Sequence, residues 1–320
     1  MKEKLTVAIV LAIVLIGTML TIAPVHAAPE DIKIGIIGPQ GLPHWSPAGM
    51  KQGAEMARDE INAAGGVNVS GVYRNITLVE GNEYSYPTIS VPDAQAEVVR
   101  LYGEGCRIMI GGFRTEVTGP MIETAMTRAE PVIFLINGAS TNELISNTVP
   151  VDYEKYKYLF RVNPVNSTAL LKTVGGSIQY LVSRMLGIFG CHWNGSIYQV
   201  KVAVLTEKLD WTLVIHNYLT NPAIYPAILG PYVNVTYSDR IDPYPGPVST
   251  KPWLDAANAT KARILIHVFS APLGRKLVYE WKAYGVGAGT PYTYMPVGIN
   301  VMAQLQDHWN PQPPWPPALG

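Results

Sequence analysis

Two glycine-containing turns are the places where this chain could bind a small anion. In the first, the apolar run Arg107–Gly112 leads to Thr115; in the second, the run Pro131–Ile136 leads to Gly138, Ala139 and Ser140. Glycine lets the backbone turn tightly, and a Ser or Thr hydroxyl at a helix start accepts a bond from the first free N–H groups. Exposed N–H donors and positive helix ends attract negative charge. We therefore expect a small carboxylate-bearing molecule at these turns.

The two apolar runs also predict the sheet that brings the turns together. A short apolar run bounded by glycine is typical of a strand buried on both faces of a parallel sheet. The carboxyl ends of parallel strands meet at one edge, where α/β proteins form their binding crevice. Ser140 with Glu143 three residues later also fits a capping box.

Strands and helices alternate along the whole chain, with a break near Arg161, which predicts two parallel sheets. In the first half we expect strands at 32–38, 76–80, 107–111 and 132–136 and helices at 49–62, 92–103 and 119–128. In the second half we expect helices at 167–186, 211–219, 253–262 and 273–284 and strands at 200–205, 232–237, 263–269 and 294–297. The predicted fold class is α/β, with two Rossmann-like lobes and a cleft between them.

The first 27 residues are predicted to be a signal peptide. Lys2 and Lys4 precede the apolar run Leu5–Ile22, and Val25–Ala27 offers a small-residue cleavage site. The alternative is a retained membrane anchor, because the apolar run is long enough to span a bilayer. Either way we expect the rest of the chain to be extracytoplasmic, whether secreted, at the cell surface, periplasmic or membrane-tethered.

Other sequence features fit an exported protein. The chain carries six Asn-x-Ser/Thr sequons, at Asn68, Asn75, Asn166, Asn194, Asn234 and Asn258. Its two cysteines, Cys106 and Cys191, are expected to be separate thiols, because a bridge between the predicted lobes would restrain their closure. With 24 basic and 24 acidic residues the chain is formally neutral, which gives no electrostatic case for binding nucleic acid.

These patterns divide the chain into a signal peptide at 1–27, lobe one at 28–160, lobe two at 161–300 and a Pro-rich tail at 301–320. Several prolines between Trp309 and Gly320 predict an extended tail.

The residues from Ile32 to Asn300 resemble the type I periplasmic solute-binding proteins of ABC importers, branched-chain amino-acid class. The segment Glu60–Gly66 carries the most specific likeness, together with Ile110–Gly112 and Phe160–Pro164. The resemblance implies a clamshell of two lobes. That family pattern returns to the first lobe after the segment near Asn300, and these return elements are missing here. We therefore expect a truncated chain or one completed by a separate polypeptide.

The resemblance also implies where a ligand binds. In this family, hydroxyls and N–H groups at the strand ends of the first lobe hold the ligand carboxylate, and the matching positions are Thr115 and Gly138–Ser140. The matching aromatic positions are Trp45 in the first lobe and Trp211 and Phe269 in the second.

The resemblance departs from the family at the acid that binds an α-ammonium group. That acid would fall near Gly298, where this chain has no carboxylate, and the nearby Asn300 is neutral. Either Glu207 or Asp210 serves instead, or the ligand is not a free amino acid, because an unpaired ammonium is costly to bury. Amides and small carboxylates therefore stay open as ligands.

The function implied by the resemblance is that of a solute-binding protein that delivers its ligand to a membrane permease. The alternative is the ligand-binding ectodomain of a membrane sensor or receptor. The sequence contains no His-Glu-x-x-His, Gly-x-Ser-x-Gly, Cys-x-x-Cys or P-loop motif, and its histidines are scattered. We expect no catalytic residues, no cofactor and no metal.

Overall fold

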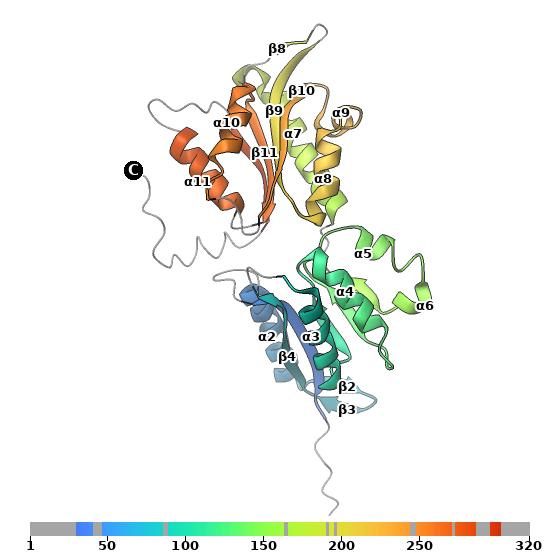
Figure 1. Ribbon diagram of the computed structural model, residues 1–320. Coiled ribbons are helices and arrows are strands. Elements are labelled where there is room, and N and C mark those ends of the chain that lie inside the picture. Colours follow the sequence, from blue (N-terminus) through green and yellow to red (C-terminus); the bar gives the residue numbers. More distant parts are fainter. Residues whose placement is uncertain are drawn as a thin grey trace, which may run out of the picture.

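The computed structural model describes residues 30–40, 47–85, 89–162, 166–189, 192–194, 197–243, 248–270, 273–285 and 295–301. Within them the chain forms two parallel sheets, each with helices on both sides, stacked end to end (Figure 1). The predicted α/β class with two lobes is confirmed. We call the unit around the first sheet lobe one and the unit around the second sheet lobe two. The signal-peptide segment and residues 302–320, which include most of the Pro-rich tail, lie outside the described residues.

Lobe one contains a five-stranded sheet in the order β4-β1-β5-β6-β7, in which every neighbouring pair is parallel. Its strands are β1 (Ile32–Gln40), β4 (Ile76–Ser85), β5 (Ile108–Gly111), β6 (Ile133–Ile136) and β7 (Leu159–Arg161). Its helices are α2 (Pro47–Ala63), α3 (Val91–Gly103), α4 (Thr115–Met126), α5 (Glu143–Ser146) and α6 (Tyr153–Tyr156).

A small antiparallel hairpin of β2 (Val67–Val69) and β3 (Val72–Arg74) precedes β4, and the sequence pattern did not predict it. The hairpin turns at Ser70 and Gly71, whose φ angles of 53° and 87° suit a tight two-residue turn.

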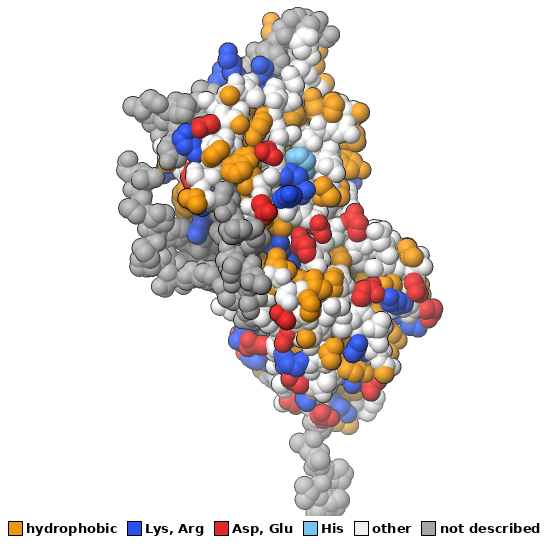
Figure 2. Space-filling view, in the orientation of Figure 1, with side chains coloured by type: hydrophobic (Ala, Val, Ile, Leu, Met, Phe, Trp, Pro, Cys, Tyr) orange, Lys and Arg blue, Asp and Glu red, His pale blue; other side chains and the backbone are white. Residues whose placement is uncertain are grey.

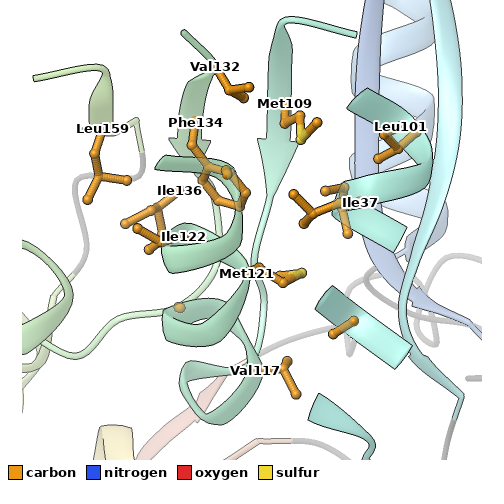
Figure 3. Packing of buried hydrophobic residues seen from close by; sticks show 14 of the residues in the cluster. Ile37, Leu101, Met109, Val117, Met121, Ile122, Val132, Phe134, Ile136 and Leu159 are labelled. Atoms are coloured by element: carbon orange, nitrogen blue, oxygen red, sulfur yellow. The ribbon is translucent and has the colours of Figure 1, made fainter. Parts of the chain in front are cut away.

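The core of lobe one lies between its sheet and the helices α3 and α4. Figure 3 shows Met121 and Ile122 of α4 lying over the strand that carries Phe134 and Ile136, and all four are essentially fully buried. Because this helix is packed along the sheet, its amino end is held at the carboxyl ends of β5 and β6.

Lobe two contains the sheet β10-β9-β11-β12, again parallel throughout, with β8 pairing antiparallel to β9. The strands are β8 (His192–Trp193), β9 (Tyr198–Glu207), β10 (Val233–Ile241), β11 (Ile264–Ser270) and β12 (Met295–Val301). The helices are α7 (Ser167–Phe189), α8 (Asp210–Thr220), α9 (Tyr225–Leu229), α10 (Lys251–Ala259) and α11 (Leu273–Gly285).

Side chains along β11 alternate between two cores. Ile264, Ile266 and Val268 pack with α7 and α8. Leu265 and Phe269 pack with α10 and α11. This period of two is what a strand buried on both faces requires.

Candidate ligand-binding site

A cavity of about 30 Å³ lies where the strand ends of the two lobes meet; we call it the interlobe cavity. Its lining residues are Phe113, Arg114, Gly138 and Ser140 of lobe one and Leu209, Trp211 and Ser270 of lobe two. A space of this size holds only one or two water molecules. The lobes are therefore closed around it, and a larger solute can enter only if they separate.

The two glycine turns of lobe one are bonded to each other. The carbonyl of Gly112 accepts hydrogen bonds from the N–H groups of Gly138 and Ala139, at 3.1 and 2.7 Å. A Cβ atom at position 138 would lie 2.8 Å from the Cα of Phe113, so only glycine permits this approach. The turns are adjacent as predicted, but the N–H groups of Gly138 and Ala139 are used inside the protein.

A buried carboxyl occupies the other turn. Glu83 of β4 accepts hydrogen bonds from the N–H groups of Phe113 and Arg114, at 2.8 and 2.7 Å. Burial raises the pKa of Glu83 to about 8, although the two backbone donors and the Arg114 guanidinium favour its ionised form. Since these donors are taken by the protein's own side chain, the expectation of free N–H groups at this turn was wrong.

The helix starts also differ from the prediction. Helix α4 begins at Thr115 with Arg114 at its N-cap, and α5 begins at Glu143 with Asn142 at its N-cap. The capping box of Ser140 and Glu143 is therefore wrong, and the Thr141 hydroxyl contacts the Glu143 carboxylate instead.

Ser140 keeps its hydrogen-bonding groups available. Among the described residues, neither its hydroxyl nor its N–H has a partner, while its carbonyl accepts from Ser167. The Thr115 hydroxyl is buried and also has no partner in the described part of the chain, but Thr115 lines a different pocket, on the outer side of α4.

Lobe two presents a carboxyl at the end of β9. Glu207 is fully buried and accepts hydrogen bonds from Trp211 Nε1 at 2.7 Å and from the Ser270 hydroxyl at 2.8 Å. Burial raises the pKa of Glu207 to about 7, against the effect of these donors. The sequence had indicated Glu207 as one possible acid, and the structure holds its carboxyl between Trp211 and Ser270, which both line the interlobe cavity.

Trp211 lines the cavity, but Phe269 does not. Phe269 is fully buried in the core beside α10 and α11. Ser270, one residue further along β11, points to the opposite face and lines the cavity. The sequence placed the aromatic residue correctly on the strand, but nothing in it showed which of the two faces meets the cavity.

Arg114 is the cavity residue that the sequence interpretation missed. It is only 5% exposed, and its Nε lies 3.3 Å from the Glu116 carboxylate. The sequence signal was a charged residue in the middle of the predicted anion-binding turn. A buried guanidinium supplies a forked donor that suits a carboxylate.

Two contacts join the lobes beside the cavity. The Ser167 hydroxyl donates to the carbonyls of Ser140 and Trp211, at 3.2 and 3.1 Å. The Glu116 carboxylate accepts from the N–H of Asp210, the first residue of α8, at 3.2 Å. A carboxylate at a helix amino end is favourable, so this contact stabilises the closed arrangement.

Several predicted features lie outside the described residues, among them Trp45 and Cys191. Cys106 is a buried free thiol, as expected. Gly298 and Asn300 lie on the backbone of β12. Within the described ranges, no cluster of potential ligands could hold a metal ion, and no helix is long and apolar enough to cross a membrane.

Residues 31–184 match the family model described as periplasmic binding protein, which covers just under half of the chain. No curated protein sequence matches the chain. Many solved structures have a similar fold, and the resemblance to periplasmic binding proteins is confirmed at that level.

Three of these structures illustrate the range. A solute-binding protein of an ABC transporter from R. palustris, in complex with 4-hydroxybenzoate, has a TM-score of 0.57 at 16% identity, covering 84% of this chain and 61% of that one. A leucine-, isoleucine-, valine-, threonine- and alanine-binding protein from Brucella ovis, in a closed conformation, has a TM-score of 0.57 at 18% identity, covering 84% and 60%. The substrate-binding protein LivJ from Streptococcus pneumoniae, in complex with isoleucine, has a TM-score of 0.55 at 17% identity, covering 84% and 64%.

This chain therefore spans about three fifths of the length of the structures that it resembles. At these identities the likeness shows the fold.

Proposed function

We propose that this chain, whose residues 31–184 match the periplasmic binding protein family, is an extracytoplasmic solute-binding protein of an ABC importer. It captures a small carboxylate, an amide or an amino acid between its lobes and delivers it to a membrane permease. It has no catalytic role. The observation that carries the proposal is the interlobe cavity, which both lobes line at the carboxyl ends of their strands.

The polar groups of the cavity support a ligand that carries a carboxylate or an amide. Arg114 and the free hydroxyl and N–H of Ser140 are donors on the lobe-one side. Trp211 provides an apolar wall on the lobe-two side. The ligand contacts both lobes, which is what makes closure depend on it, because a ligand that binds two states equally shifts nothing.

Glu207 supports a way to tell the ligand classes apart. With a pKa of about 7, its carboxyl gains negative charge as the pH rises from 6 to 8. An ammonium group favours the ionised carboxyl, so the affinity for an amino acid should rise over this range. A ligand with a carboxylate and no ammonium should bind more weakly as Glu207 ionises.

The experiment is a thermal-shift screen of the mature chain against amino acids, their amides, and aliphatic and aromatic carboxylates. A ligand at 100 times its Kd should add about 2.7 kcal/mol to the free energy of unfolding. Ser140→Ala should reduce the shift, whereas Ser146→Ala should not, because Ser146 is an exposed residue of α5 that bonds only its own neighbourhood.

Repeating the titration at pH 6 and pH 8 with Glu207→Gln then identifies the ligand class. The amide keeps the hydrogen-bonding shape but does not titrate, so the pH dependence of affinity should disappear. If a cooperatively folding chain is shifted by none of these compounds, or if Ser140→Ala binds as well as the wild type, the proposal is wrong.

A further inference from the structure

A second and larger pocket lies on the outer side of the contact between the lobes; we call it the seam groove. Its walls are α4 and the segment 141–148 of lobe one and the first two turns of α8 of lobe two. It has a volume of about 560 Å³, which is in the range of small-molecule sites. The interlobe cavity shares none of its lining residues.

The floor of the seam groove is apolar. Ile122 and Leu144 of lobe one are nearly fully buried, while Leu213 of α8 remains 42% exposed although it faces this pocket. An exposed leucine in a concave apolar wall gains free energy when a ligand removes it from water.

The rim of the seam groove is acidic. Glu123, Glu143 and Asp210 line it, and no lysine or arginine does. Glu123 is already paired with Lys155, at 2.6 Å, so Glu143 and Asp210 are the carboxylates with no cation at the rim. Figure 2 shows acidic side chains beside an apolar patch where the two lobes meet.

These carboxylates are close enough to affect each other. The pKa of Asp210 is raised, first by burial and then by the negative charges of Glu116 and Glu143, although Arg240 and Arg114 act in the opposite direction. The amino ends of α4 and α8 add about half a positive charge each, which leaves the surroundings negative. A cation in the groove would relieve this repulsion. The buried, unpartnered hydroxyl of Thr115 is a further polar group in the lining.

We propose that the seam groove is a second ligand site, distinct from the interlobe cavity, and that it binds an amphipathic organic cation: a small molecule with an apolar body and one ammonium or guanidinium group. The apolar body lies against Ile122, Leu144 and Leu213, and the cation lies between Glu143 and Asp210. Because the walls come from both lobes, the occupant stabilises the closed arrangement. The inference does not depend on the solute-binding function.

The test uses hexylammonium as the probe, with hexanol and hexanoate as matched probes that keep the chain and change the charge. Binding to the mature chain is measured by saturation-transfer NMR and calorimetry. Hexylammonium should bind more tightly than hexanol, hexanoate should not bind, and added salt should weaken the binding of hexylammonium. Hexylammonium should also raise the thermal midpoint of the chain.

Variants then locate the site. Glu143→Gln should weaken hexylammonium binding by about two- to five-fold, as expected for a partly exposed ion pair. Glu154→Gln is the matched control, because Glu154 is an exposed glutamate of lobe one paired with Lys157. Leu213→Ser should weaken all apolar probes, whereas Val99→Ser, at a valine on α3 with 46% exposure, should weaken none.

Three outcomes would overturn the proposal. Hexanol may match hexylammonium, which would make the groove a merely apolar surface. Glu143→Gln and Glu154→Gln may behave alike, which would mean that only general surface charge attracts the probe. Glu207→Gln may weaken binding more than Glu143→Gln does, which would put the cation in the interlobe cavity.

Discussion

The two lobes hold a buried carboxyl at the same end of their sheets, but they use it differently. In lobe one, Glu83 binds two backbone N–H groups and so fastens the β5–α4 turn to β4. In lobe two, Glu207 binds two side chains, Trp211 and Ser270, that themselves line the interlobe cavity. The first carboxyl maintains the backbone, and the second organises a surface that a ligand can touch. A buried acid near a cleft is therefore not by itself a sign of ligand binding; its partners decide its role.

The largest expected effect tests the role of Glu83. Glu83→Ala leaves the N–H groups of Phe113 and Arg114 without their acceptor in a buried turn, which should cost about 2 to 6 kcal/mol of folding free energy. Glu83→Gln keeps an acceptor oxygen and should cost clearly less. Chemical denaturation of both variants measures the difference, and equal losses would contradict the assigned role.

The matching change in lobe two should be milder. Glu207→Ala removes the acceptor of Trp211 Nε1 and of the Ser270 hydroxyl, but both groups lie at a cavity where water can replace it. We expect a loss of about 1 to 2 kcal/mol, with a larger effect on ligand binding than on folding. Should Glu207→Ala destabilise the chain as much as Glu83→Ala, the contrast between the lobes would not hold.

The pH dependence of stability should reveal both carboxyls. Glu83 and Glu207 have pKa values raised to about 8 and about 7, so the folded chain keeps protons that the unfolded chain releases from about pH 4.5 upward. Their contribution is complete at low pH and is lost as the pH rises through the folded values. The thermal midpoint should fall by several degrees between about pH 6 and 8.5, and a Glu83→Gln, Glu207→Gln double variant should show a flatter curve.

His267 contributes in the opposite direction. Burial lowers its pKa to about 4, so its contribution is complete above about pH 6.5 and is lost as the pH falls toward 4. His267→Gln should therefore flatten the acid side of the stability curve and leave the alkaline side unchanged.

The smallest expected effect concerns the contact between the lobes. Glu116→Gln weakens the bond to the Asp210 N–H and removes the negative charge from the amino end of α8, at a cost of about 0.3 to 1 kcal/mol. The folding of each lobe should be unaffected, but small-angle scattering should show a larger radius of gyration as the lobes separate more often. Glu154→Gln, at an exposed site on lobe one, is the control.

Much of the architecture could be predicted from the sequence alone because it depends on local patterns. Apolar runs bounded by glycine predicted strands β5 and β6, and their alternation with helices predicted two parallel sheets. The position of Trp211 directly after β9 followed from the same alternation. These features are repeated along the chain, so an error in one element does not change the class of the fold.

The candidate site could be predicted only in part. Gly138, Ser140 and Trp211 were identified, but the roles of Arg114, Glu83 and Ser270 were not. Glu83 is 30 residues before Phe113 in the sequence, and only the pairing of β4 with β1 and β1 with β5 brings it to the turn. Phe269 and Ser270 differ by one position on a strand with cores on both faces, so no apolar pattern could show which one faces the cavity.

The sequence by itself therefore determined the class of fold and the edge at which a ligand could bind, because hydrophobic periodicity and glycine turns act over a few residues. Only the tertiary structure decided which N–H groups remain free and which acid meets the cavity, because hydrogen bonds between distant strands compete for the same donors. The same is true of the seam groove. Its acidic rim and apolar floor come from α4, the segment 141–148 and α8, and these meet only when the two lobes close on each other.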